Sequence, residues 1–142
     1  MFKRYRFFGF TLLELLVVIS IIGILLAVGA VAFSNAQKKG RDSRRRSDMK
    51  SLQNAFEQYY AQNGSYADCD TMADENISGG HQATKDPKTG VLYTDANCSV
   101  ATDHSSYCVC AELETGGGNS SDGSCNWTTD PNSNYFCVQN LQ

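Results

Sequence analysis

Hydrophobic and polar positions divide the chain into three stretches. In the first, the nineteen residues 15–33 are uncharged and almost all apolar. A helix of that length extends for about 28 Å at ~1.5 Å per residue, close to the thickness of a bilayer core. The pattern therefore predicts one membrane-spanning helix near the N-terminus.

In the second stretch, residues 34–63, apolar side chains recur at spacings of three and four, as on one face of an amphipathic helix. They are Met49, Leu52, Ala55, Phe56, Tyr59 and Tyr60. No proline lies between Thr11 and Asn63. We therefore expect one continuous helix from the membrane segment through Gln62, with Asn63-Gly64 ending it.

The third stretch, residues 64–142, is rich in Gly, Ser, Asn and Asp and contains short apolar runs. These runs predict three strands, at 91–94, 107–113 and 135–139. Residues 65–90 are expected to be mostly irregular, and 116–123 to form a flexible excursion between the second and third strands. The expected fold is α+β, with a long N-terminal α-helix packed on a small antiparallel sheet.

All cysteines fall in this third stretch. They are Cys69, Cys98, Cys108, Cys110, Cys125 and Cys137. An even number in a small exported domain predicts disulfides, and six cysteines allow fifteen pairings. Cys108 and Cys110 lie on one face of a strand, so we expect them to have different partners. No pair has the C-x₂₋₄-C spacing of zinc sites, so no zinc site is expected.

Charge is divided unevenly along the chain. Residues 1–63 hold ten basic and four acidic side chains, a net charge of +6, and residues 64–142 hold two basic and eleven acidic, a net charge of −9. If several copies of the chain assemble, the acidic residues 64–142 (the head) of one copy could therefore lie against the basic residues 1–63 (the stem) of its neighbours. Within one helix, Asp42 and Arg46 are spaced to pair.

Six basic residues gather just after the apolar run: Lys38, Lys39, Arg41, Arg44, Arg45 and Arg46. Nucleic acid is nevertheless an unlikely partner, because the head is acidic. Contact with solvent or lipid headgroups is expected instead. Residues with catalytic potential are sparse: Asp103-His104-Ser105 has the residue types of a triad, but consecutive side chains cannot take its positions. No enzymatic activity is expected, and His81 and His104 are expected on surface loops.

A short motif, Gly9-Phe10-Thr11-Leu12-Leu13-Glu14, separates a basic start from the apolar run. A carboxylate at the edge of a membrane segment is costly unless a cation meets it. The pattern resembles the class III signal of type IV pilins and type II secretion pseudopilins. The resemblance implies that a prepilin peptidase cleaves after Gly9 and that the new amine of Phe10 is methylated. It also implies that Glu14 meets the Phe10 ammonium of a neighbouring subunit and sets the register of assembly.

The same resemblance implies an organisation for the whole chain. Its parts would be a leader peptide at 1–9, a transmembrane and polymerisation helix at 10–33, an amphipathic continuation at 34–63, and a disulfide-stapled head at 64–142. The leader would be cytoplasmic and the head outside the cell membrane. The partners would be further copies of the chain or other pilins, the peptidase, an inner-membrane assembly platform, and membrane lipid before assembly. The product would be an extracellular filament or a periplasmic pseudopilus.

For the head, the resemblance suggests a Cys125–Cys137 disulfide that closes the C-terminal loop. Many pseudopilins also bind calcium in this loop, where the present chain offers Asp122, Asn126, Asp130, Asn132 and Asn134. No motif matches residue by residue, and oxygen-rich loops are common without an ion, so no cofactor is expected.

Two other interpretations of the N-terminus stay open. An ordinary secretory signal could be cleaved at Ala30-Val31-Ala32 and release a soluble domain that starts at Phe33. An uncleaved anchor is the other, and the excess of basic residues after the apolar run would then place the head in the cytoplasm. Neither explains Gly9 together with Glu14, and six cysteines favour export. The rival function is a secreted or membrane-tethered binding domain that does not polymerise.

Overall fold

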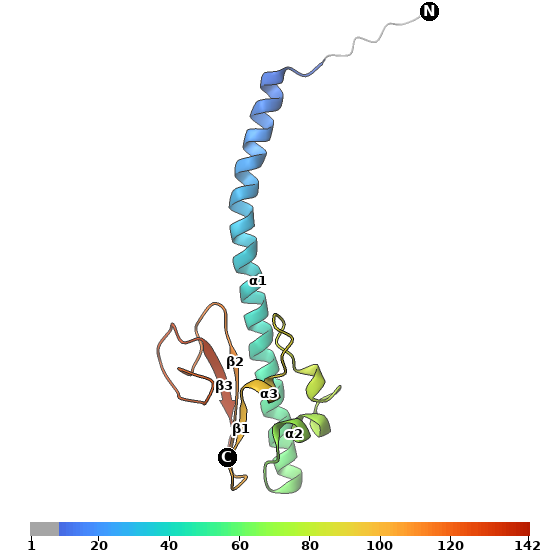
Figure 1. Ribbon diagram of the computed structural model, residues 1–142, viewed down its shortest axis with the longest axis vertical. Coiled ribbons are helices and arrows are strands. Elements are labelled where there is room, and N and C mark those ends of the chain that lie inside the picture. Colours follow the sequence, from blue (N-terminus) through green and yellow to red (C-terminus); the bar gives the residue numbers. More distant parts are fainter. Residues whose placement is uncertain (1–8) are drawn as a thin grey trace, which may run out of the picture. The chain divides into compact units, whose positions relative to one another are not determined.

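The computed structural model describes residues 9–142, so all but the last residue of the expected leader lies outside the described residues. The chain forms two compact units that divide between Gln37 and Lys38. Figure 1 shows its elements, which are α1 (Leu12–Asn63), α2 (Cys69–Asn76), the 3₁₀ turn η1 (His81–Ala83), α3 (Tyr93–Ala96), β1 (Cys98–Val100), β2 (Tyr107–Glu112) and β3 (Tyr135–Gln139).

Helix α1 is continuous over 52 residues, which confirms the prediction of a single long helix. It ends at Asn63 because Gly64 takes a positive φ of 74°, a conformation that favours glycine. The Gly64 N–H donates to the carbonyl of Tyr60 at 2.8 Å and so satisfies one of the last carbonyls of the helix. The predicted stop at Asn63-Gly64 is thus confirmed.

In the first unit, every large apolar side chain from Leu12 to Phe33 is at least 46% exposed. The helix is long and apolar enough to cross a membrane by its length and composition. An apolar surface of this size is unfavourable in water, and a bilayer or a packed array of helices removes it from water. The segment has the properties of a membrane anchor.

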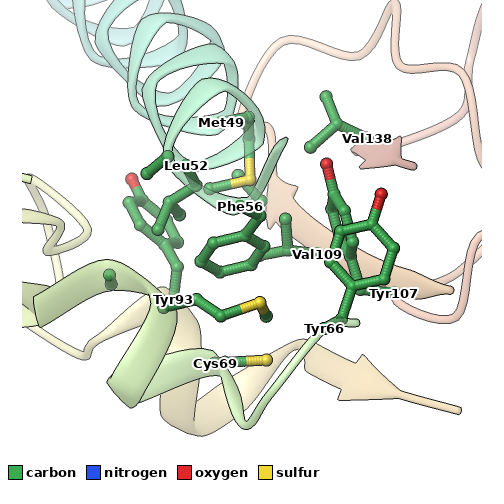
Figure 2. Close-up of a cluster of buried hydrophobic side chains, with 13 residues drawn as sticks. Met49, Leu52, Phe56, Tyr66, Cys69, Tyr93, Tyr107, Val109 and Val138 are labelled. Atoms are coloured by element: carbon green, nitrogen blue, oxygen red, sulfur yellow. The ribbon is translucent and has the colours of Figure 1, made fainter. Parts of the chain in front are cut away.

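In the second unit, the later half of α1 supplies the centre of a hydrophobic core. Met49, Leu52 and Phe56 are fully buried, as the amphipathic pattern predicted. Figure 2 shows them meeting side chains from the sheet and from the short helices. The Phe56 and Tyr107 rings lie edge to face with centroids 4.9 Å apart. Burying a side chain of this kind contributes about 1.5–3 kcal/mol, so this helix face fastens α1 to the head.

The sheet has the order β1-β2-β3 and is antiparallel throughout. Alternate residues of β2 face opposite sides. Tyr107, Val109 and Ala111 belong to the core, and Cys108 and Cys110 therefore point to the other face. The α+β class that the sequence predicted, a long helix on a small antiparallel sheet, is confirmed.

The outer edge of β3 is closed by a side chain. Asn119 accepts a hydrogen bond from the Cys137 N–H at 2.7 Å and donates one to the Cys137 carbonyl at 2.9 Å. Its own N–H, with that of Ser120, donates to the Tyr135 carbonyl. Gly118 is needed here because a Cβ at this position would overlap the Tyr135 backbone. The excursion after β2 thus protects an edge that would otherwise expose unpaired backbone groups.

Two local predictions for the head were wrong. The strand expected at 91–94 is a single bridge at Leu92 followed by α3, and the first strand of the sheet is instead β1. An apolar run this short does not distinguish a strand from a helix by its periodicity. Tyr93 is buried although it lies in α3 and not in a strand. Within 65–90, expected to be mostly irregular, the sequence reading missed α2.

Three disulfides join Cys69 to Cys98, Cys108 to Cys125, and Cys110 to Cys137. The predicted disulfides, and the separate partners of Cys108 and Cys110, are confirmed. The Cys125–Cys137 pairing was wrong, because the strand register sets Cys137 directly opposite Cys110. The Cα atoms of this pair are only 4.1 Å apart, and Cys125 is left to reach Cys108.

Candidate functional site

The residues around the predicted cleavage point lie at the start of α1. Gly9, Phe10 and Thr11 precede the first helical residue, and the Phe10 side chain is 85% exposed. Among the described residues beyond its chain neighbours, no atom lies within 4 Å of the position that a Cβ on Gly9 would occupy. A peptidase needs an accessible, non-helical peptide bond, and the Gly9–Phe10 bond meets both conditions in the described part of the chain.

Glu14 closes a hydrogen-bonded cap on the first turn of α1. Its carboxylate accepts from the Thr11 N–H at 2.9 Å and from the Thr11 hydroxyl at 3.0 Å, and the Thr11 hydroxyl accepts from the Glu14 N–H at 3.2 Å. This reciprocal pattern is a capping box. The Thr-x-x-Glu spacing is its signature, and our sequence reading overlooked it while it singled out Glu14 for assembly.

The cap determines which hydrogen bonds the Glu14 carboxylate already makes within its own chain. In a single chain one of its oxygens accepts both hydrogen bonds from Thr11 at the helix's own N-terminus, where the macrodipole also favours negative charge. The Phe10 nitrogen is only one residue before the capped N–H. The structure thus brings Phe10, Thr11 and Glu14 together at one helix end and leaves the carboxylate exposed.

The second unit contains a network of ion pairs that fastens α1 to the head. Arg45, only 2% exposed, donates to Asp86 at 2.6 Å, to Asp42 at 2.8 Å and to Glu114 at 3.0 Å. Arg41 makes a bidentate pair with the same Glu114, at 2.7 and 2.8 Å. A buried guanidinium needs several carboxylate partners to offset its lost hydration, and it has them here.

These contacts shift the acid–base properties of the carboxylates. Burial by itself would raise the pKa of Asp86, but hydrogen bonds from Arg45 and from backbone N–H groups outweigh it and lower the pKa to about 2. The Arg41 guanidinium holds the pKa of Glu114 far below its ordinary range. Burial opposes the shift at Asp42 too, yet bonds from Thr115, Glu114 and Arg45 lower its pKa. All three acids are therefore charged at neutral pH.

The network corrects two expectations about the basic cluster. Asp42 pairs with Arg45 and not with Arg46, which donates to the Gly117 carbonyl at 2.8 Å and lies over the Phe136 ring. Arg41 and Arg45 face the chain's own head rather than solvent or lipid. The sequence reading did not see this because their partners are about 40 to 70 residues away.

The remaining candidate residues make hydrogen bonds that hold the loops of the head. Asp103 accepts from the Ser105 hydroxyl at 2.7 Å, while the His104 ring lies 2.8 Å from the Tyr66 carbonyl, so these three residues do not form a triad. In the C-terminal loop, Asp122 accepts from the Asn126 side chain at 2.6 Å.

The other loop oxygens named above are also partly engaged. Asp130 accepts from the Asn132 N–H at 2.9 Å. The Asn134 carbonyl accepts from Leu113. Several oxygens considered for calcium thus already stabilise the turns of the loop itself.

Comparison with known proteins bears on the same N-terminal segment. Residues 4–30 match the family described as the prokaryotic N-terminal methylation motif. Over 60 residues the chain is 35% identical to the type IV major pilin protein PilA of Myxococcus xanthus (strain DK1622). The aligned part covers 42% of this chain and 27% of that pilin, so the match spans about a quarter of its relative. No solved structure matches the chain.

The chain thus combines an α+β fold with a long helix that begins with a methylation motif and an unburied apolar half. The motif and the similarity to a major pilin support the type IV pilin family for this chain. The resemblance drawn from Gly9 to Glu14 is thereby confirmed.

Proposed function

We propose that the chain is cleaved after Gly9 by a prepilin peptidase, methylated on Phe10, and polymerised through its N-terminal helix into a filament. The observation that carries this proposal is the unburied apolar face of α1 between Leu12 and Phe33. Inside the membrane, lipid covers this face, and in a filament neighbouring helices would replace the lipid. The head would remain outside and present its surface.

Glu14 would set the register of neighbouring helices. In one chain its carboxylate is held by Thr11, and in the filament it would also accept from the Phe10 ammonium of a neighbour. A charge in an apolar helix bundle is stable only when its counter-ion is in place, so chains out of register would be disfavoured. The role is structural, and it requires no bond-making step by the chain itself.

Processing is tested by the mass and N-terminal sequence of the chain purified without reductant from the membranes and from the soluble fraction of its native cells. The proposal predicts a chain that starts with methylated Phe10 and is lighter by six hydrogens than the fully reduced form, because three disulfides are present. A start at Phe33 would show a released soluble domain, and an intact Met1 a plain anchor. Either result would overturn the proposal.

Assembly is tested separately with Glu14→Gln, which keeps the size of the side chain and removes its charge. We expect cleavage after Gly9 to continue and filament yield to fall at least about tenfold, as for a lost pairing of charges in an apolar medium. Glu75→Gln, on the exposed surface of α2, is the matched control and should assemble normally. Normal filaments from Glu14→Gln would refute the register role.

A further inference from the structure

We infer that Cys108, Cys110, Cys125 and Cys137, once reduced, form a four-thiolate site for Zn²⁺. Their four sulfur atoms all lie within 4.8 Å of one another. Ligand sulfurs in a tetrahedral zinc site are about 3.8 Å apart, since each Zn–S bond is about 2.3 Å. The sulfurs of Cys108 and Cys110 already lie 3.6 Å apart although they belong to different disulfides.

The fold produces this cluster from three separate segments. Cys108 and Cys110 share one face of β2, and the register of the sheet places Cys137 of β3 opposite Cys110. Cys125 comes from the excursion between these strands, where it takes a positive φ of 56°. Because the ligands meet only through strand pairing and a long loop, the spacing along the sequence gave no sign of a zinc site.

Burial within the cluster suits a structural site with an entry path. Cys110 and Cys137 are at most 1% exposed, and Cys125 is the most accessible member of the cluster. Reductant and metal can thus reach the Cys108–Cys125 disulfide first, from the side of Cys125. Four protein ligands leave no open position on the metal, so the site would hold structure and would not activate water.

The disulfide and zinc forms exclude one another, because only thiolates bind the metal. Each disulfide takes up two electrons and two protons to give two thiols, and an external dithiol or phosphine supplies the electrons and is itself oxidised. Zn²⁺ then displaces four protons from the four thiols, leaving a complex with net charge −2. One metal link would replace two disulfides and keep the excursion on the sheet.

The third disulfide supplies an internal control. Cys69 and Cys98 join α2 to β1, and they do not belong to the cluster of four. On reduction they become ordinary thiols in the same chain. Selective protection of four cysteines out of six therefore distinguishes the folded site from binding by an unfolded chain.

The test uses the full chain in detergent, reduced with a phosphine and treated with iodoacetamide in the presence or absence of one equivalent of Zn²⁺. We expect zinc to slow alkylation of the four cluster cysteines at least about tenfold, as metal coordination ties up the thiolates. Cys69 and Cys98 should react at an unchanged rate. Mass spectrometry of peptides reads each cysteine separately. Equal labelling of all six, or protection spread over all six, would overturn the inference.

Two variants sharpen the result, with Co²⁺ as a coloured substitute for zinc. The double variant Cys69→Ser/Cys98→Ser should still bind one Co²⁺ per chain, with the intense charge-transfer absorption of a tetrahedral thiolate site. Cys110→Ser should lose that absorption or show the weaker spectrum of three sulfurs. A Cys110→Ser spectrum identical to that of the unaltered reduced chain would overturn the inference as well.

Discussion

Two charged residues of α1, Asp42 and Arg45, each make three hydrogen bonds to the head. The Arg45 guanidinium lies among Asp42, Asp86 and Glu114. The next residue towards the N-terminus, Arg44, is 63% exposed in its side chain and approaches Asp48 only to 3.9 Å. Two adjacent arginines thus occupy opposite environments on one helix.

The contrast between Arg44 and Arg45 predicts that replacing each by methionine changes the free energy of unfolding by very different amounts. Arg45→Met leaves buried carboxylates without a counter-ion, so the free energy of unfolding should fall by about 3–5 kcal/mol. Arg44→Met should change it by less than about 1 kcal/mol, as for an exposed ion pair. Urea unfolding followed by circular dichroism measures both. Equal effects would show that the buried network contributes no more than a surface pair.

At the other end of α1, Thr11 caps the first turn of the helix together with Glu14. Thr11→Ala removes the hydroxyl that caps the helix while leaving the Glu14 charge in place. We expect the first turn to be destabilised by about 1 kcal/mol, seen as faster amide hydrogen exchange there in detergent. Exchange in the last turn, near Asn63, provides the control. Unchanged exchange near Glu14 would mean that the capping box contributes little in a membrane environment.

At the scale of elements, the attachment of α1 to the head depends on pH. The pKa values of Asp42, Asp86 and Glu114 are lowered in the folded chain, so the unfolded chain binds protons more readily than the folded one. The contribution of these carboxylates to the free energy of unfolding is complete above the ordinary carboxyl range near pH 4. For Asp86, this contribution is lost as the pH falls through about 2. Asp48, whose pKa burial raises, opposes this trend.

The measurement is the free energy of unfolding in urea between pH 7 and pH 2. We expect a steady decrease below about pH 4. Asp86→Asn should be less stable at pH 7 and should show a shallower decrease, because it has one fewer carboxylate with a lowered pKa. A decrease as steep as that of the unaltered chain would exclude Asp86 as a contributor.

The Cys69–Cys98 disulfide fastens α2 and β1 across a separation of 29 residues. Replacing both cysteines by serine removes a constraint on the unfolded chain, and the free energy of unfolding should fall by about 3 kcal/mol. The buried position of Cys69 adds a smaller cost for placing a hydroxyl there. Thermal unfolding without reductant gives the difference. A change under about 1 kcal/mol would show that packing alone holds α2.

The elements also show what the sequence could predict. Helix α1 and strands β2 and β3 were predictable because a 3.6-residue period or an alternating pattern persists over enough residues. The short α2 was missed, although Asp68 caps it and Cys69, Met72 and Ala73 have helical spacing. The disulfide partners depend on strand register and loop path, which no local pattern specifies. At the N-terminus, the motif from Gly9 to Glu14 is local and was therefore recognised from the sequence.

For the whole molecule, every buried residue described lies at or after Asp42. A chain starting at residue 34 therefore keeps the complete core and loses the exposed apolar segment. We expect it to be soluble and monomeric, with three disulfides and the urea midpoint of the full chain in detergent. Sedimentation and urea unfolding test this. Aggregation, or a clearly lower midpoint, would mean that residues before 34 stabilise the head.

Part of the basic charge of the stem is neutralised within the same chain, which changes how stem and head could attract each other between chains. Arg41 and Arg45 are neutralised by acids of their own head, so these two charges are not available to neighbouring heads. Lys39 and Arg44 are exposed, and Lys38 is partly exposed. Attraction between acidic heads and basic stems of neighbours, if it operates in a filament, would depend on this smaller set.

The closure of β3 by Asn119 makes the strand edge sensitive to deamidation of that side chain. The Asn119 side chain satisfies the Cys137 N–H and carbonyl at once, because the amide carries both an acceptor oxygen and a donor NH₂. Hydrolysis of that amide to a carboxylate keeps the acceptor and replaces the donor by a negative oxygen that faces a carbonyl. An ageing chain would then open the strand edge from within, by the loss of a single ammonia molecule, while all three disulfides stay intact.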